Sequence, residues 1–280
     1  MTALDLRLAD GRVLRVYDSA AEQRADTFTI VWHHGSPQTG APLPPLVSAA
    51  AARGIRLLSY GRPSYGGSSP NLGRDVAAAA ADVAQLADAL GVTRFAVMGA
   101  SGGGPHALAC AALLPHRVTG AVCLAGLAPR TSDFDWFAGM VSPGGLEAAV
   151  GGRPARARYA TTDEFDEDSF TPADWAALSG RWASLGADAA RAGATGVEGL
   201  IDDDVAFAAP WGFDPARIDV PVLFAQGGED RVVPPSHADW LLRRCPRAEL
   251  WLRPHDGHVS ILEACPVAMD WLVAQAASAA

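Results

Sequence analysis

Lysine is absent from this 280-residue chain, whose 22 basic residues are all arginine. A P-loop lysine, a Schiff-base lysine and a lysine general base are therefore excluded. Cysteine is scarce, and its four positions include no Cys-x-x-Cys pair, so neither a disulfide framework nor a zinc knot is indicated. The sequence also lacks an early basic-then-apolar segment and any apolar run of membrane-spanning length, so we expect an unexported, cytoplasmic protein with no membrane partner.

Positive charge is outnumbered, because 31 acidic residues give a formal net charge of −9. Nucleic-acid surfaces need clustered positive charge, so we expect no nucleic-acid partner. The whole excess lies in residues 127–215, which hold 15 acidic residues and 6 arginines. For the runs 163–168 and 202–204 we expect a solvated face, although their sum biases which substrates enter.

Short apolar runs alternate with helical patterns over most of the chain, which is typical of a parallel sheet covered by helices. Residues 4–8 and 13–17 alternate around Asp10-Gly11 and predict a hairpin. Further strands are predicted over 28–32, 55–60, 95–98, 118–125, 220–225 and 248–252. Helices are predicted over 43–53, 74–90, from the turn at residue 101 to 114, over 236–244 and over 259–276.

This alternation breaks between residues 127 and 215, where the sequence is irregular, acidic and rich in tryptophan. Short helices are predicted over 172–185 and 199–207. We therefore expect a core made of residues 1–126 and 216–280, with 127–215 inserted as a helical cap, or lid, over the strand ends, where open α/β sheets bind ligands. Trp136, Trp182 and Trp211 are its candidate substrate-binding residues.

A serine between glycines follows the run Phe95–Met98, in the order Gly99-Ala100-Ser101-Gly102-Gly103. An alanine-rich helical pattern begins at once, so the serine is expected on a sharp strand-to-helix turn. Residues without a β-carbon fit such a turn without clashing. The helix behind it would direct N–H groups and the positive end of its dipole at whatever Ser101 attacks, as suits a nucleophile.

Polar turns after two later strands supply partners for this serine, because strands of a parallel sheet end at the same edge. Asp230 follows the strand 220–225, and His258 follows 248–252. A serine hydroxyl needs a base, and an imidazole oriented by a carboxylate can take and return its proton. We therefore assign Ser101 as nucleophile, His258 as base and Asp230 as acid, with Glu229 the weaker alternative to Asp230.

The loop His33-His34-Gly35-Ser36-Pro37 follows the strand at 28–32. A glycine there lets the backbone approach a ligand, so the N–H of Ser36 is a candidate oxyanion donor, together with that of Gly102. A metal site at the two histidines is disfavoured, because neighbours on an extended backbone point to opposite sides. No metal is expected.

Four motifs in this order resemble the α/β-hydrolase superfamily: His-Gly-Ser-Pro at 34–37, Gly-Ala-Ser-Gly-Gly at 99–103, Gly-Glu-Asp at 228–230 and Gly-His at 257–258. The resemblance implies an eight-stranded, mostly parallel sheet flanked by helices with a helical cap, Ser101, Asp230 and His258 as a catalytic triad, hydrolysis through an acyl-enzyme, and no cofactor. Serine at 101 argues against the haloalkane dehalogenase and epoxide hydrolase members, which attack with a carboxylate.

The sequence thus predicts a serine hydrolase that cleaves a carboxylic ester, lactone or thioester of a small, mainly apolar or neutral substrate. A proline-iminopeptidase-like aminopeptidase is an alternative, because an acidic cap could receive a substrate ammonium. A C–C bond hydrolase or a cofactor-independent oxygenase on the same scaffold is another. A ligand-binding relative without turnover is the non-enzymatic alternative. The oligomeric state is left open.

Overall fold

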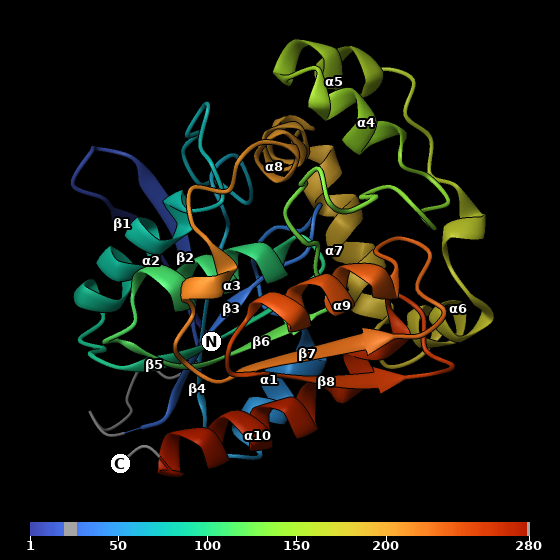
Figure 1. The fold of residues 1–280 in the computed structure, drawn as a ribbon. Coiled ribbons are helices and arrows are strands. Elements are labelled where there is room, and N and C mark those ends of the chain that lie inside the picture. The colour runs from blue at the N-terminus through green and yellow to red at the C-terminus, as the bar shows by residue number, and fades with distance from the viewer. Residues whose placement is uncertain (20–26, 279–280) are drawn as a thin grey trace.

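A twisted sheet of eight strands forms the centre of the protein in a computed structural model that describes residues 1–19 and 27–278 (Figure 1). The strand order is β1-β2-β4-β3-β5-β6-β7-β8. The pairs β1·β2 and β2·β4 are antiparallel, and all other neighbours run parallel. The strands are β1 (Thr2–Arg7), β2 (Val13–Asp18), β3 (Thr29–His33), β4 (Arg56–Tyr60), β5 (Phe95–Ala100), β6 (Val118–Leu124), β7 (Val222–Gly227) and β8 (Ala248–Arg253).

Helices cover both faces of this sheet, which explains why the central strands are buried along almost their whole length and are mostly apolar. Every residue of β3, β5 and β7 is buried. Helices α2 (Ala78–Ala89), α3 (Gly103–Leu113) and α9 (Pro235–Arg244) lie on one face, and α1 (Pro44–Ala51) and α10 (Cys265–Ser278) lie on the other (Figure 1). The expected eight-stranded, mostly parallel sheet flanked by helices is confirmed.

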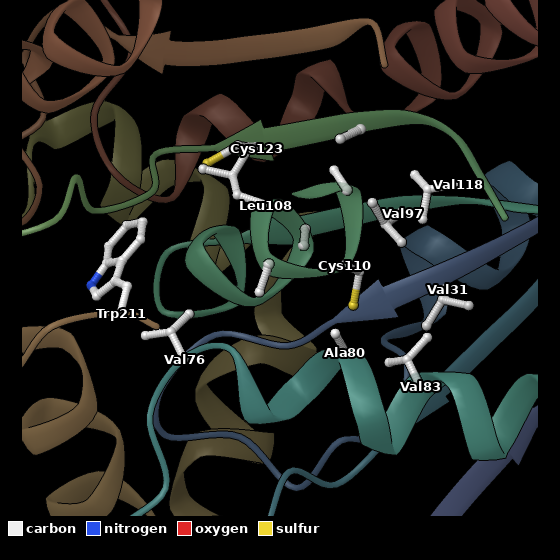
Figure 2. Packing of buried hydrophobic residues seen from close by; sticks show 14 of the residues in the cluster. Val31, Val76, Ala80, Val83, Val97, Leu108, Cys110, Val118, Cys123 and Trp211 are labelled. Atoms are coloured by element: carbon white, nitrogen blue, oxygen red, sulfur yellow. The ribbon is translucent and has the colours of Figure 1, made fainter. Parts of the chain in front are cut away.

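The core on the α2 and α3 face is packed from side chains of several elements (Figure 2). Val83 of α2 and Cys110 of α3 point toward Val31 of β3, and all three are fully buried. Apolar area removed from water contributes about 25 cal/mol per Å², so this contact between helices and sheet is a main source of stability. The four cysteines of the chain are all buried and unpaired with one another.

Two predicted helices differ from the structure at their starts. The helix predicted from residue 74 begins at Ala78, whose N–H donates to the Asp75 side chain at 2.9 Å. The closing helix predicted over 259–276 opens with a short 3₁₀ helix, η3 (Ser260–Ala264), before α10 begins at Cys265.

Five α-helices follow β6 before the chain returns to the sheet at β7. They are α4 (Gly144–Val150), α5 (Arg153–Tyr159), α6 (Pro172–Ser179), α7 (Ala183–Ala194) and α8 (Glu198–Ala208), with a short 3₁₀ helix η1 (Glu167–Ser169) and, just before β7, η2 (Pro215–Arg217). We call residues 127–215 the insertion. The predicted helix over 199–207 is confirmed as α8, whereas α4 and α5 had no sequence signal that we recognised.

The single helix predicted over 172–185 is wrong. The chain turns at Gly180, whose backbone angles of φ −116° and ψ −121° are not helical, and this separates α6 from α7. A glycine inside a helical pattern weakens the helix because it gains backbone freedom when the helix opens. Across residues 1–19 and 27–278, no helix is both long and apolar enough to cross a bilayer.

Candidate active site

Ser101 lies between the end of β5 and the start of α3, in a left-handed backbone conformation with φ +52°. Its N–H donates to the Leu124 carbonyl on β6 at 2.8 Å, which fixes the turn to the sheet. The chain can turn this sharply because Gly103 lies against β3: a Cβ there would come within 2.0 Å of the His33 carbonyl oxygen. The strand–turn–helix context expected from the sequence is present, and it exposes the Ser101 hydroxyl.

His258 brings its ring to this hydroxyl from the loop after β8. Its Nε2 lies 2.9 Å from Ser101 Oγ, at hydrogen-bond distance. A neutral imidazole with an unprotonated Nε2 can accept the hydroxyl proton, so the geometry suits a general base. The two residues are 157 positions apart in the chain and meet at one edge of the sheet, as the parallel topology predicts.

Asp230 holds the other side of the same ring. Its Oδ2 lies 2.8 Å from His258 Nδ1 and also accepts the Gln226 side-chain amide at 3.2 Å. Its Oδ1 accepts the backbone N–H groups of Val232 and Val233, each at 2.9 Å. These bonds orient the carboxylate, which in turn places the proton of His258 on Nδ1.

Glu229, the alternative acid, points away from this contact. Its carboxylate lies 3.6 Å from the exposed ring of His255 instead. The His255 side chain is 92% exposed, and its ring contacts Glu229, whereas the ring that contacts Ser101 is that of His258.

Two opposing effects act on the pKa of the His258 ring. Burial disfavours the charged imidazolium, but the Asp230 carboxylate and, more weakly, Asp174 favour it, and the net result is a pKa above the ordinary value of 6.5. A base of this kind retains a strong affinity for the proton that it removes from the hydroxyl.

Ser36 and Gly102 lie side by side next to the hydroxyl. A Cβ on Gly102 would come within 2.4 Å of Ser36 Oγ, so only glycine allows the two loops to approach this closely. Within the described part of the chain, neither backbone N–H has an acceptor of its own. Two donors in this position can stabilise a negatively charged oxygen that forms beside Ser101.

A cavity of about 460 Å³ opens at Ser101 and His258. Its walls are mainly apolar and come from both the sheet edge and the insertion. Trp32 and Leu43 contribute from the core, and Leu146, Leu185 and Phe207 contribute from α4, α7 and α8. Such a cavity suits a small organic molecule with few polar groups.

Of the three candidate tryptophans, only Trp182 lines this cavity, with its Nε1–H donating to Glu263 at 3.0 Å. Trp136 and Trp211, the other two candidate substrate-binding residues, do not line the cavity. Both are buried in the hydrophobic core, where their N–H groups donate to the carbonyls of Ala128 and Phe207. A buried tryptophan needs a partner for its N–H, and a backbone carbonyl supplies it here. Trp32, on β3, lines the cavity and was not predicted.

The run Asp202–Asp204 is not the solvated face that we expected, because all three side chains are buried on α8. Each pairs with arginine: Asp202 with Arg153, Asp203 with Arg62 and Arg74, and Asp204 with Arg156. Burial raises the pKa of Asp204 to about 7 even though Arg156 opposes the shift. The other run, 163–168, is exposed as expected.

Asp203 connects the insertion to the loop that carries Ser36. It accepts the Ser36 hydroxyl at 2.5 Å, Arg62 at 2.7 Å, Arg74 at 2.5 Å and the Tyr65 hydroxyl at 3.0 Å. Arg62 also donates to Ser36 Oγ at 2.8 Å and to the His34 carbonyl. Burial alone would raise the Asp203 pKa, but the two guanidinium groups hold it well below its usual range. No sequence pattern predicts this cluster, because its members are distant in the chain.

The remaining buried histidines serve other purposes. His33 and His34 lie inside the protein, and burial lowers the pKa of His33 to about 3. His106 bonds to the Gly102 carbonyl, and His237 receives the Ala128 N–H and contacts the Trp136 carbonyl. Among residues 1–19 and 27–278, no group of three or more His, Cys, Asp or Glu side chains is placed to hold a metal ion.

Comparison with known proteins gives one consistent result. A model of the α/β hydrolase fold family matches residues 29–264. The chain is 31% identical to a non-heme chloroperoxidase of Streptomyces lividans, over 76% of this chain and 78% of that protein. It is 28% identical to a putative carbamate hydrolase of Caulobacter sp. strain K31, over 89% of each.

Solved structures agree in fold. The bromoperoxidase of Bacillus anthracis superimposes with a TM-score of 0.76 at 20% identity, covering 98% of this chain and 100% of that one. The enol-lactonase of Burkholderia xenovorans LB400 gives a TM-score of 0.73 at 20% identity, covering 97% and 99%.

The Asp203 cluster generates a prediction about stability. Asp203→Asn would leave Arg62 and Arg74 buried without their shared carboxylate, so we expect a loss of about 3 to 5 kcal/mol in the free energy of unfolding. Asp270→Asn, which breaks an exposed pair with Arg53, is the control and should cost less than about 1 kcal/mol. Urea unfolding followed by circular dichroism measures both, and equal small losses would contradict the assigned importance of the cluster.

Proposed function

This chain belongs to the α/β hydrolase fold family, and on that basis we propose that it is a serine hydrolase that cleaves an ester-type bond through an acyl-enzyme on Ser101. The bond is a carboxylic ester, lactone or thioester of a small, mainly apolar or neutral substrate. The observation that carries the proposal is the unbroken hydrogen-bond chain from Ser101 to His258 at 2.9 Å and from His258 to Asp230 at 2.8 Å, at the edge of an apolar cavity.

In the first half-reaction, Ser101 Oγ attacks the substrate carbonyl carbon while His258 Nε2 takes the hydroxyl proton. Asp230 stabilises the imidazolium that forms. The carbonyl oxygen becomes negatively charged, and the N–H groups of Ser36 and Gly102 are placed to stabilise it, helped by the positive end of the α3 dipole. The tetrahedral intermediate then expels the alcohol or thiol, which receives the proton from His258.

In the second half-reaction, water attacks the acyl-enzyme. His258 takes a proton from this water and returns it to Ser101 Oγ, so the acid product leaves and the enzyme is restored. All the groups needed are side chains or backbone N–H groups of this chain. The mechanism therefore requires no cofactor.

The insertion, residues 127–215, serves in this proposal as a cap over the strand ends. Support comes from the cavity, because side chains of α4, α7 and α8 line it opposite Ser101. Its position holds the acyl or alcohol part of the substrate between the sheet edge and the insertion. Closing the site in this way keeps bulk water from the intermediate and strengthens the hydrogen bonds around it.

The ion pairs between the aspartates of α8 and arginine favour an ester hydrolase over an aminopeptidase. A substrate ammonium needs a carboxylate that no other cation occupies, yet Asp202, Asp203 and Asp204 are each paired with arginine. Glu164 and Asp166 also border the cavity, but both are exposed to water, which weakens their attraction for a substrate ammonium. A ligand-binding relative without turnover is disfavoured, because binding alone does not require the aligned Ser101, His258 and Asp230.

Removal of the nucleophile is the direct test. Ser101→Ala should abolish hydrolysis of p-nitrophenyl acyl esters, a loss of at least about 1,000-fold in kcat, while the thermal unfolding curve stays close to that of the unchanged protein. Ser142→Ala is a matched control, because Ser142 also lines the cavity but has no hydrogen bond to Ser101, His258 or Asp230, and it should retain most activity. Full activity in the Ser101 variant would refute the proposal.

The raised pKa of His258 predicts the pH profile. Only the neutral ring can act as base, so kcat/KM should fall as pH decreases through a midpoint above 6.5. Asp230→Asn removes the charge that favours the imidazolium, so its midpoint should lie at lower pH, and its maximal rate should be lower by about 10⁴. Initial rates between pH 5 and 9 give both values, and a midpoint that does not respond to this substitution would contradict the pairing.

Substrate class is tested with matched leaving groups. We expect a short-chain acyl ester to be cleaved at least about 100-fold faster, in kcat/KM, than a prolyl arylamide, because the carboxylates of α8 are already paired. The opposite preference would favour the aminopeptidase. Peroxide-dependent halide oxidation is assayed in parallel because the Streptomyces lividans relative is named a chloroperoxidase.

A further inference from the structure

A second carboxylate approaches the histidine loop from the insertion. Asp174 lies on α6, and none of its side chain is exposed. Its Oδ1 accepts the backbone N–H groups of Val259 and Ser260, each at 2.8 Å, and the Ser260 hydroxyl at 3.0 Å. Its Oδ2 accepts the N–H of His258 at 3.2 Å and both the N–H and the hydroxyl of Thr171 at 3.0 Å.

The six donors come from two separate segments, which the Asp174 carboxylate holds together. Two belong to Thr171, which forms a capping box with Asp174 at the start of α6. The other four belong to His258, Val259 and Ser260, at the start of η3. Three consecutive N–H groups at a helix start need acceptors, and Asp174 supplies one from a distant part of the chain. A residue that served only α6 would need no contact with the core.

The Asp174 carboxylate packs closely against the backbone at Gly257. A Cβ on Gly257 would come within 2.0 Å of Asp174 Oδ2, so the glycine directly before His258 allows the carboxylate to reach the backbone. Gly257 N–H is itself held by Ser260 Oγ at 2.7 Å. The backbone on both sides of His258 is thereby fixed by Asp174 and by the hydroxyl bound to it.

We propose that Asp174 is a positioning residue for His258, so that the insertion takes part in holding the base against Ser101. This inference rests on the proposed serine-hydrolase function. Asp230 sets the direction of the imidazole ring through Nδ1, and Asp174 sets the backbone from which the ring projects. Displacement of a reacting group by 1 Å can cost about 100-fold in rate, so a base held from two sides has a clear kinetic advantage.

Asp174 also acts on the charge of the ring. Two carboxylates favour the imidazolium of His258, Asp230 from the loop after β7 and Asp174 from α6, while burial opposes them. Loss of the Asp174 charge should therefore lower the His258 pKa. A purely structural role would not move this value, so the pH profile separates the two possibilities.

The test is the rate at which a fluorophosphonate labels Ser101, measured by intact mass between pH 5 and 9, because labelling needs the activated serine but no knowledge of the substrate. In Asp174→Asn the second-order rate constant at pH 8 should fall by about 10- to 100-fold. Its pH midpoint should lie below that of the unchanged protein, because one of the two carboxylates that raise the His258 pKa has lost its charge. Asp82→Asn, which removes another buried carboxylate that pairs with Arg12, should lose stability but keep the midpoint.

The outcomes separate the two proposals. An unchanged protein that takes no label would refute the serine-hydrolase function itself. Labelling of Asp174→Asn with the rate and midpoint of the unchanged protein would refute only the role of Asp174. If Asp174→Asn does not fold, Ser260→Ala keeps the charge and removes one of its hydrogen bonds. It should be labelled several-fold more slowly at an unchanged midpoint, and a rate equal to that of the unchanged protein would overturn the inference.

Discussion

The left-handed turn at Ser101 is the constraint on which the rest of the site depends. It places a hydroxyl at the point where β5 ends and α3 begins, and it is possible only because glycines at 99 and 103 admit the neighbouring backbone. A serine at φ +52° is strained, and the sheet on either side must hold it. The N–H bond from Ser101 to Leu124 does so directly. The loops that bring Ser36, Asp230 and His258 are arranged around this fixed hydroxyl.

The insertion makes its contribution through buried charge. Asp203 reaches the Ser36 loop through the Ser36 hydroxyl and the Arg62 guanidinium group, and Asp174 reaches the backbone at His258. Both carboxylates lie in surroundings that exclude water, where a hydrogen bond to a charged group is stronger and an unpaired charge is more costly than at the surface. The segment that we propose as a cap is thus anchored on both sides of the hydroxyl. Phe165 also borders the cavity, and its side chain is exposed.

The main features of the fold could be predicted from the sequence because strand and helix patterns alternate and parallel strands end at one edge. The same rule placed Ser101, Asp230 and His258 together, since each follows a strand. The ion pairs could not be predicted in this way. Asp203 meets Arg62 and Arg74 across about half the chain, and no spacing rule links them, so composition suggested a solvated run. Trp136 and Trp211 illustrate the same difficulty, because tryptophans that line a cavity and tryptophans that fill a core have the same sequence signal.

Intact mass and peptide mapping after exposure to a fluorophosphonate would test the central claim most directly, because the reagent reports an activated serine whatever the natural substrate is. The account predicts a single stoichiometric adduct on the peptide that contains Ser101, and its loss when His258 is replaced by alanine. A folded protein that carries no adduct, or an adduct on another serine, would contradict the account.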